Sequence, residues 1–196
     1  MSKPTSHTAF QDVTRIAGGA LATVALAVKT AVAADPTAQV LVFDDATGKV
    51  VDLDLRGSDA EIAARYAPHS EDAAPAADEA RRGRGRPKLG VVAREVTLLP
   101  RHWDWLALQP GGASQALRRL VDEARKADGG RSSARAAQER TYAFIATMAG
   151  DREGFEEASR ALFAGDKARF AEHSRTWPRD IRDHTEKLLA DAAAND

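Results

Sequence analysis

The alternation of apolar and polar residues in the first third of the chain predicts strands joined by a turn. Residues 39–43 form an apolar run, and residues 44–48 have the composition of a turn. In residues 49–55 every second side chain is apolar, which places these side chains on one face of a strand. The pattern predicts a β-hairpin over 39–55, and residues 8–16 suit an opening strand.

A helical spacing of apolar residues follows the opening strand. Leu21, Val24 and Val28 recur at the spacing of one helix face, which predicts a helix over 20–34. Ser58 precedes a second short helix, with Glu61 three residues later in the reciprocal capping position. Together with the hairpin, these helices predict a small α+β domain over residues 1–66.

The pattern changes in the middle of the chain. Residues 67–82 are rich in alanine, proline and acids without periodicity, and we interpret them as a linker. Residues 91–98 alternate loosely, as a strand does, and residues 101–109 suit a helix ended by Pro110-Gly111-Gly112. A second helix is expected from Ser114, so residues 83–128 read as a strand-helix-helix module.

The last segment, residues 129–196, is expected to be entirely helical. Residues 135–149 suit one helix, and the pattern Gly-Asp followed by a phenylalanine occurs twice, at 150–155 and at 165–170. Trp177-Pro178 precedes the last helix. The fold class predicted for the whole chain is α+β, with a C-terminal helical bundle.

Charge is distributed unevenly along the chain. Residues 1–80 carry 6 Lys/Arg and 12 Asp/Glu, residues 81–126 carry 11 and 4, and residues 127–196 carry 11 and 13. A basic middle between acidic flanks favours a polyanionic partner. The same pattern also suits a basic segment that pairs with the acidic residues of this protein.

The basic segment resembles the AT-hook, a family that lies extended in the minor groove of A·T-rich DNA. Its core is Gly85-Arg86-Pro87, in which proline favours an extended conformation for the preceding arginine. Arginines favour the negative potential of a narrow minor groove. The resemblance implies DNA contacts by Arg82, Arg84, Gly85, Arg86, Pro87 and Lys88, although a solvated basic linker has the same composition.

The order strand, helix, helix over 92–126 resembles the ribbon-helix-helix family, in which two chains pair their strands in the major groove. The resemblance implies a homodimer whose outward strand residues are Ala93, Glu95 and Thr97. Thr97 suits a base contact, whereas Glu95 would place an anion among phosphates. The start of the second helix would hold a phosphate near Ser114, Arg118 and Arg119. The alternative is that the module packs on the N-terminal domain.

Over nearly its full length the chain also resembles a bacterial family known as domain of unknown function 2239. The resemblance rests on GRPKLGVVAREVTLLPRHWDWL, PGGASQALRRLVDEAR, ALFAGDKARF and WPRDIRDH. It implies a shared architecture and no particular chemistry.

Composition argues against several other classes of function. There is no cysteine, which excludes disulfides and thiolate chemistry. Asp44, Asp45, Asp52 and Asp54 are interpreted as turn or solvent-facing residues, and His173, Asp183 and His184 as surface or packing residues. The chain has no nucleotide-binding loop, zinc-protease helix or nucleophile elbow. We therefore expect no enzyme, no metal and no cofactor.

The leading hypothesis is a cytoplasmic, dimeric DNA-binding protein of regulatory or architectural type that recognises A·T-rich duplexes. No membrane association is expected, because the apolar run 16–34 is interrupted by Lys29. The alternative is a protein–protein adaptor, or an antitoxin-like scaffold, without catalytic activity. Trp103 and Trp105 cannot share one helix face, so we expect one in the core and the other in an interface.

Overall fold

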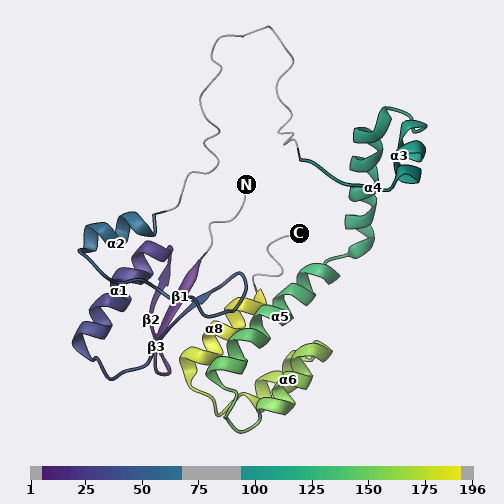
Figure 1. Cartoon of the computed structure of the whole chain (residues 1–196). Helices are drawn as coiled ribbons and strands as arrows, with labels where there is room; N and C mark the ends of the chain where they lie inside the picture. Colours follow the sequence, from purple (N-terminus) through teal and green to yellow (C-terminus); the bar gives the residue numbers. More distant parts are fainter. Residues whose placement is uncertain (1–5, 68–93, 191–196) are drawn as a thin grey trace. The chain divides into compact units, whose positions relative to one another are not determined.

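The computed structural model describes residues 6–67 and 94–190 (Figure 1). The chain divides into two compact units. In the described parts, the first unit comprises residues 6–67 and 130–190, and the second comprises residues 94–129. The N-terminal strands and the C-terminal helices thus belong to the same unit.

The first unit contains a three-stranded antiparallel sheet. Strands β1 (His7–Gln11), β2 (Thr14–Gly19) and β3 (Val40–Asp44) are ordered β2-β1-β3. The prediction of one strand over 8–16 is wrong, because the chain reverses at Asp12. This residue has φ of +51°, which aspartate tolerates better than most residues. Its backbone amide also donates to the carbonyl of Gln39, 2.8 Å away.

The predicted hairpin over 39–55 forms only in its first half. After β3 the chain returns for a single bridge between Phe43 and Val50, and residues 51–55 form no strand. The backbone amide of Asp54 donates to the hydroxyl oxygen of Tyr66 at 2.6 Å, and Arg65 donates to the Asp54 carbonyl at 2.7 Å. The amide of Val51 still donates to the carbonyl of Val42 in β3, at 2.8 Å, whereas the backbone of Asp54 is bonded to side chains.

Two helices accompany the N-terminal sheet, as predicted. Helix α1 (Leu21–Ala34) packs Val24 and Val28 against apolar residues of β1 and β3. Helix α2 (Asp59–Arg65) begins with the expected capping box, in which Ser58 and Glu61 exchange hydrogen bonds. In Figure 1 both helices lie on the side of the sheet opposite to α5 and α8.

The C-terminal segment is helical, as expected. It comprises α5 (Arg131–Met148), α6 (Phe155–Ala164), α7 (Lys167–His173) and α8 (Arg179–Ala190). The two Gly-Asp patterns differ in their detail. Asp166 caps α7 and accepts from the amide of Arg169, whereas α6 begins after Gly154 instead of Asp151.

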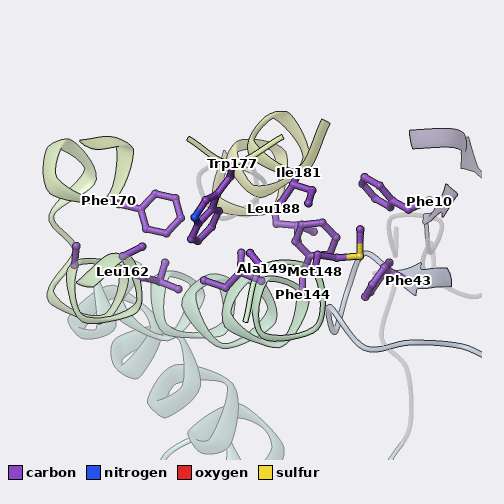
Figure 2. Packing of buried hydrophobic residues seen from close by; sticks show 13 residues of the cluster. Phe10, Phe43, Phe144, Met148, Ala149, Leu162, Phe170, Trp177, Ile181 and Leu188 are labelled. Carbon is purple, nitrogen blue, oxygen red and sulfur yellow. The ribbon is translucent and has the colours of Figure 1, made fainter. Parts of the chain in front are cut away.

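The main core joins the sheet to the C-terminal helices. Phe10 and Phe43 from the strands meet Phe144 of α5 with ring centroids 5.5 and 4.9 Å apart. Figure 2 shows this row of side chains continuing through Leu188 and Trp177 to Phe170. All of these residues are buried. The N-terminal strands therefore depend on the C-terminal helices for the cover of their aromatic side chains.

The turn after β3 also lies against α5. Gly48 has φ of +68°, and a Cβ at this position would overlap the backbone carbonyl of Arg140. The Arg140 side chain in turn donates from Nε and Nη2 to the carbonyl of Leu188, at 2.9 and 2.6 Å. The turn, α5 and α8 are thus held together by close backbone and side-chain contacts.

The second unit is a helical hairpin. It consists of α3 (Pro100–Ala107) and α4 (Gly112–Asp128), both close to the predicted helices. The strand predicted over 91–98 is wrong for residues 94–98, which form no strand. A strand of a ribbon needs a second strand for its hydrogen bonds. In the described part of this single chain, no strand pairs with residues 94–98. Residues 91–93 lie outside the described residues.

Candidate functional site

The start of α4 has no side-chain cap, although the amide of Gly112 donates to the carbonyl of Gln109 at 3.0 Å. The residue before the helix is Gly111 with φ of +80°, no side chain caps the first turn, and the first turn has no acidic residue. The first amides of a helix have no partner within it and carry partial positive charge. This helix start has the features of an anion-binding position.

Two of the predicted site residues lie at this helix start. Ser114 is in the first turn of α4, and Arg118 lies one turn further, with its Nε donating to the Ser114 carbonyl at 3.1 Å. Both side chains are exposed. The bond uses one guanidinium donor of Arg118. Helix α4 thus brings Arg118 next to Ser114, one turn apart near its start.

The other residues predicted to contact DNA are not shown to lie next to Ser114 and Arg118. Arg119 is exposed and lies 3.9 Å from the carboxylate of Glu123, a weak surface pair. Thr97 is exposed in the segment that precedes α3 and forms no strand there. The residues expected to enter the minor groove, namely Arg82, Arg84, Gly85, Arg86, Pro87 and Lys88, lie outside the described residues.

Helix α3 exposes both of its tryptophans. Trp103 is 41% exposed and Trp105 is 47% exposed, so the expectation that one of them lies in the core is wrong. Leu106 takes the core position, because it is the residue that faces α4 and it is buried. Leu108 is 82% exposed beyond it. The hairpin therefore presents an apolar surface.

A buried polar cluster in the first unit was not expected from sequence. The carboxylate of Asp45 accepts from Lys187 Nζ at 2.6 Å and from the hydroxyl of Thr8 at 3.2 Å. His184 Nε2 lies 3.5 Å from its other oxygen. Asp45 lies in a turn, as predicted, and is nevertheless buried; His184 is also buried, which agrees with the packing alternative and not with the surface one. Asp45 and Lys187 are 142 positions apart in the sequence. Local residue spacing therefore gave no indication that they form a pair.

The electrostatics of this cluster favour an uncharged histidine. Burial lowers the pKa of His184 to about 4, and the positive charges of Lys187 and Arg15 act in the same direction. The negative charge of Asp45 opposes this shift but does not overcome it. At neutral pH the cluster therefore consists of one ion pair, Lys187 with Asp45, beside a neutral imidazole.

A cleft of about 540 Å³ lies beside this cluster. It is lined by Lys187, Ser6, Arg15 and residues 16–19 of the edge strand β2. The amide of Arg15 is occupied by the Asp180 carboxylate at 2.8 Å, and Lys187 by Asp45. The His184 side chain is fully buried, and the contacts of His184 and Lys187 with Asp45 link α8 to the turn after β3.

Two classes of feature are absent from the described ranges 6–67 and 94–190. No group of three or more histidine, aspartate or glutamate side chains there is placed to hold a metal ion. No helix in these ranges is long and apolar enough to cross a bilayer.

The described chain is a mixed α and β protein, with a small antiparallel sheet and mainly helices. Residues 6–189 match the model of a family described as an uncharacterized protein conserved in bacteria, domain of unknown function 2239. The chain belongs to this family. No curated protein and no solved structure matches it.

Proposed function

We propose that the protein binds double-stranded DNA through its central region, residues 83–128. The observation that carries the proposal is the start of α4, where uncapped amides lie beside the exposed Ser114 and the side chain of Arg118. Phosphate contacts of this kind position a protein on a duplex without reading its sequence. Arg119, one residue further, adds charge near the same phosphate.

The positive charge of the central part of the sequence also supports DNA binding by this region. Residues 81–93 contain five Lys/Arg and no Asp/Glu, and they lead directly into the segment before α3. The likeness of Gly85-Arg86-Pro87 to an AT-hook gives the reason to expect preference for A·T-rich minor grooves. We propose regulatory or architectural DNA binding by a homodimeric, cytoplasmic protein.

The proposal assigns no base contact to a β-ribbon. Residues 94–98 form no strand, so Thr97 is proposed to contact the DNA backbone from an extended segment. Specificity then rests on groove width and charge rather than on the direct reading of bases.

The experiment is fluorescence anisotropy of the full chain with A·T-rich and G·C-rich duplexes at two salt concentrations. We expect tighter binding to the A·T-rich duplex and affinity that falls steeply with salt. The logarithmic slope should be about 0.9 for each phosphate neutralised. Absence of binding to either duplex at low salt would refute the proposal.

Two sets of substitutions separate the proposed contacts. Replacing Arg84, Arg86 and Lys88 with alanine should remove most of the affinity and the A·T preference. Replacing Arg118 and Arg119 should lower affinity for both duplexes alike and reduce the salt slope. The control replaces Arg160 and Arg169, two exposed arginines of the first unit. Equal loss in the control would show that only net charge matters.

The apolar surface of α3 supports a second candidate function, that of a protein–protein adaptor. Trp103 and Trp105 are exposed on different faces of α3, Leu108 is exposed just after the helix, and tryptophans of this kind often anchor interfaces. Capture of a partner should survive nuclease and high salt, and should be lost on substitution of Trp105 and Leu108 with serine. Loss of capture on nuclease treatment would favour the DNA proposal instead.

A further inference from the structure

A cavity of about 310 Å³ lies between α7 and α8 in the first unit. Phe170 and Trp177, both buried, form part of its wall, and their rings meet edge to face with centroids 6.1 Å apart. Ala171 and Leu189 extend the apolar lining. Ligand cavities in proteins measure roughly 300–1,000 Å³, so a ligand here would be small.

Most of the polar groups in the wall are already bonded within the helices. The Ser174 hydroxyl donates to the carbonyl of Phe170 at 2.8 Å, and the Thr185 hydroxyl donates to the carbonyl of Ile181 at 2.7 Å. Neither hydroxyl hydrogen is available to a ligand. The charged side chains that line the cavity are Lys167, Arg182 and Glu186.

Arg182 is the unusual member of this set. Its Nε is buried and has no hydrogen-bond partner among the residues that the structure describes. Buried donors in proteins nearly always have an acceptor. The guanidinium is a planar, permanently charged fork that matches a carboxylate. The buried Nε does not itself open into the cavity, but Arg182 lines it, and the charge of the guanidinium beside an apolar wall suits an anion with an apolar body.

We propose that this cavity binds a small organic carboxylate with an unbranched apolar tail. The carboxylate lies on Arg182, and the tail packs against Phe170 and Trp177. Lys167 adds a second positive charge, so that the lining carries two cations against the single anion of Glu186. The site lies on helices that the proposed DNA contacts do not use, and the two proposals fail independently.

Titration calorimetry of the full chain with octanoate tests the site. We expect saturable binding, with octan-1-ol and propanoate each at least about tenfold weaker, because the first lacks the charge and the second lacks most of the apolar tail. Octan-1-ol that binds as well as octanoate would overturn the proposal, since it would show a merely apolar cavity. Absence of heat with octanoate would also overturn it.

Two arginines of α8 form a matched pair for mutation. Arg182→Met should weaken the binding of octanoate at least about tenfold and leave the affinity for octan-1-ol unchanged, because only the ionic contact is lost. Arg179→Met should change neither, since Arg179 is 84% exposed and pairs with Asp183 outside the cavity. Equal affinity for octanoate in the two variants would refute the role of Arg182.

A second pair of variants tests the cavity itself. Ala171→Leu places extra volume in the lining and should abolish octanoate binding, whereas Ala168→Leu, on an exposed position of the same helix, should not. In a chain with Trp103→Phe and Trp105→Phe, octanoate should change the emission of Trp177. Unchanged emission would contradict the proposal. This measurement does not depend on whether the Ala171→Leu variant folds.

Discussion

The two units of this protein bury their apolar residues to very different degrees. In the first unit, Phe10, Phe43 and Phe144 are fully buried and touch one another across more than a hundred positions of sequence. In the helical hairpin, Leu106 and Ala116 are the buried hydrophobic residues, while Trp103 and Trp105 stay about half exposed. The first unit has a core of its own, and the hairpin has almost none.

This difference separates stability from recognition. A short helical hairpin with two buried side chains cannot offset the loss of chain entropy that folding requires. Such an element gains stability when a partner covers its apolar surface. The comparison therefore assigns structural integrity to the first unit, and it agrees with our proposal that the hairpin binds a partner.

The largest expected effect comes from the aromatic core. Phe144→Ala removes the ring that joins Phe10 and Phe43, and should lower the free energy of unfolding by about 3–5 kcal/mol. Urea unfolding followed by circular dichroism measures the change. A loss below about 1 kcal/mol would show that this core does not hold the unit together.

The next effect is a dependence of stability on pH. Burial holds the pKa of His184 at about 4, below the value of 6.5 expected in the unfolded chain. Between these values the unfolded chain binds the extra proton, so this contribution is complete above pH 6.5 and is lost as pH falls toward 4. Its size is on the order of 3 kcal/mol.

The His184→Gln variant tests this assignment. The free energy of unfolding, obtained from urea titrations between pH 7 and pH 4, should fall less steeply with pH in the variant than in the parent chain. The difference in slope should correspond to about one proton fewer bound on unfolding. Identical slopes would mean that His184 titrates alike in the folded and unfolded chains.

A smaller effect is expected at the ion pair beside His184. Lys187→Met leaves the buried Asp45 carboxylate without its closest cation and should cost about 2 kcal/mol, less than for a fully buried pair because Lys187 is 40% exposed. Arg160→Met, which breaks a surface pair with Glu156, should cost about 0.5 kcal/mol or less. Equal unfolding free energies for the two variants would argue against a structural role for the cluster.

The smallest effect should occur in the hairpin. Trp105→Ala should change the stability of the first unit by less than about 0.5 kcal/mol, because this tryptophan is half exposed on α3. Sedimentation measures whether it changes assembly at the same time. A cost comparable to that of Phe144→Ala would show that a partner covers α3 and that the two units are equally well packed.

Local signals in the sequence were sufficient for most of the helices. The capping box at Ser58 and Glu61, and the apolar spacing of α1, depend on residues within four positions of one another. Strand β3 was also predictable from its apolar run. Such features are encoded locally and do not require knowledge of the rest of the fold.

Features that depend on distant residues were missed. The alternation at Leu53 and Leu55 suited a strand, but these side chains pack beside α1 while Tyr66 holds the local backbone. Asp45 suited a turn, and nothing near it reveals Lys187. The helix that carries Ser114 and Arg118 was predictable, because one helical turn relates the two residues, but their role in binding stays a prediction.

The cover of Phe10 by α8 and α5 has a consequence for synthesis on the ribosome. Strand β1 emerges early, yet its aromatic side chain finds its partners Phe144 and His184 only when α5 and α8 have been made. The N-terminal sheet must therefore leave the exit tunnel with its aromatic face open to solvent. Slow translation between β3 and α5 would lengthen that exposure, and chaperones that bind aromatic segments would find the nascent chain during this interval.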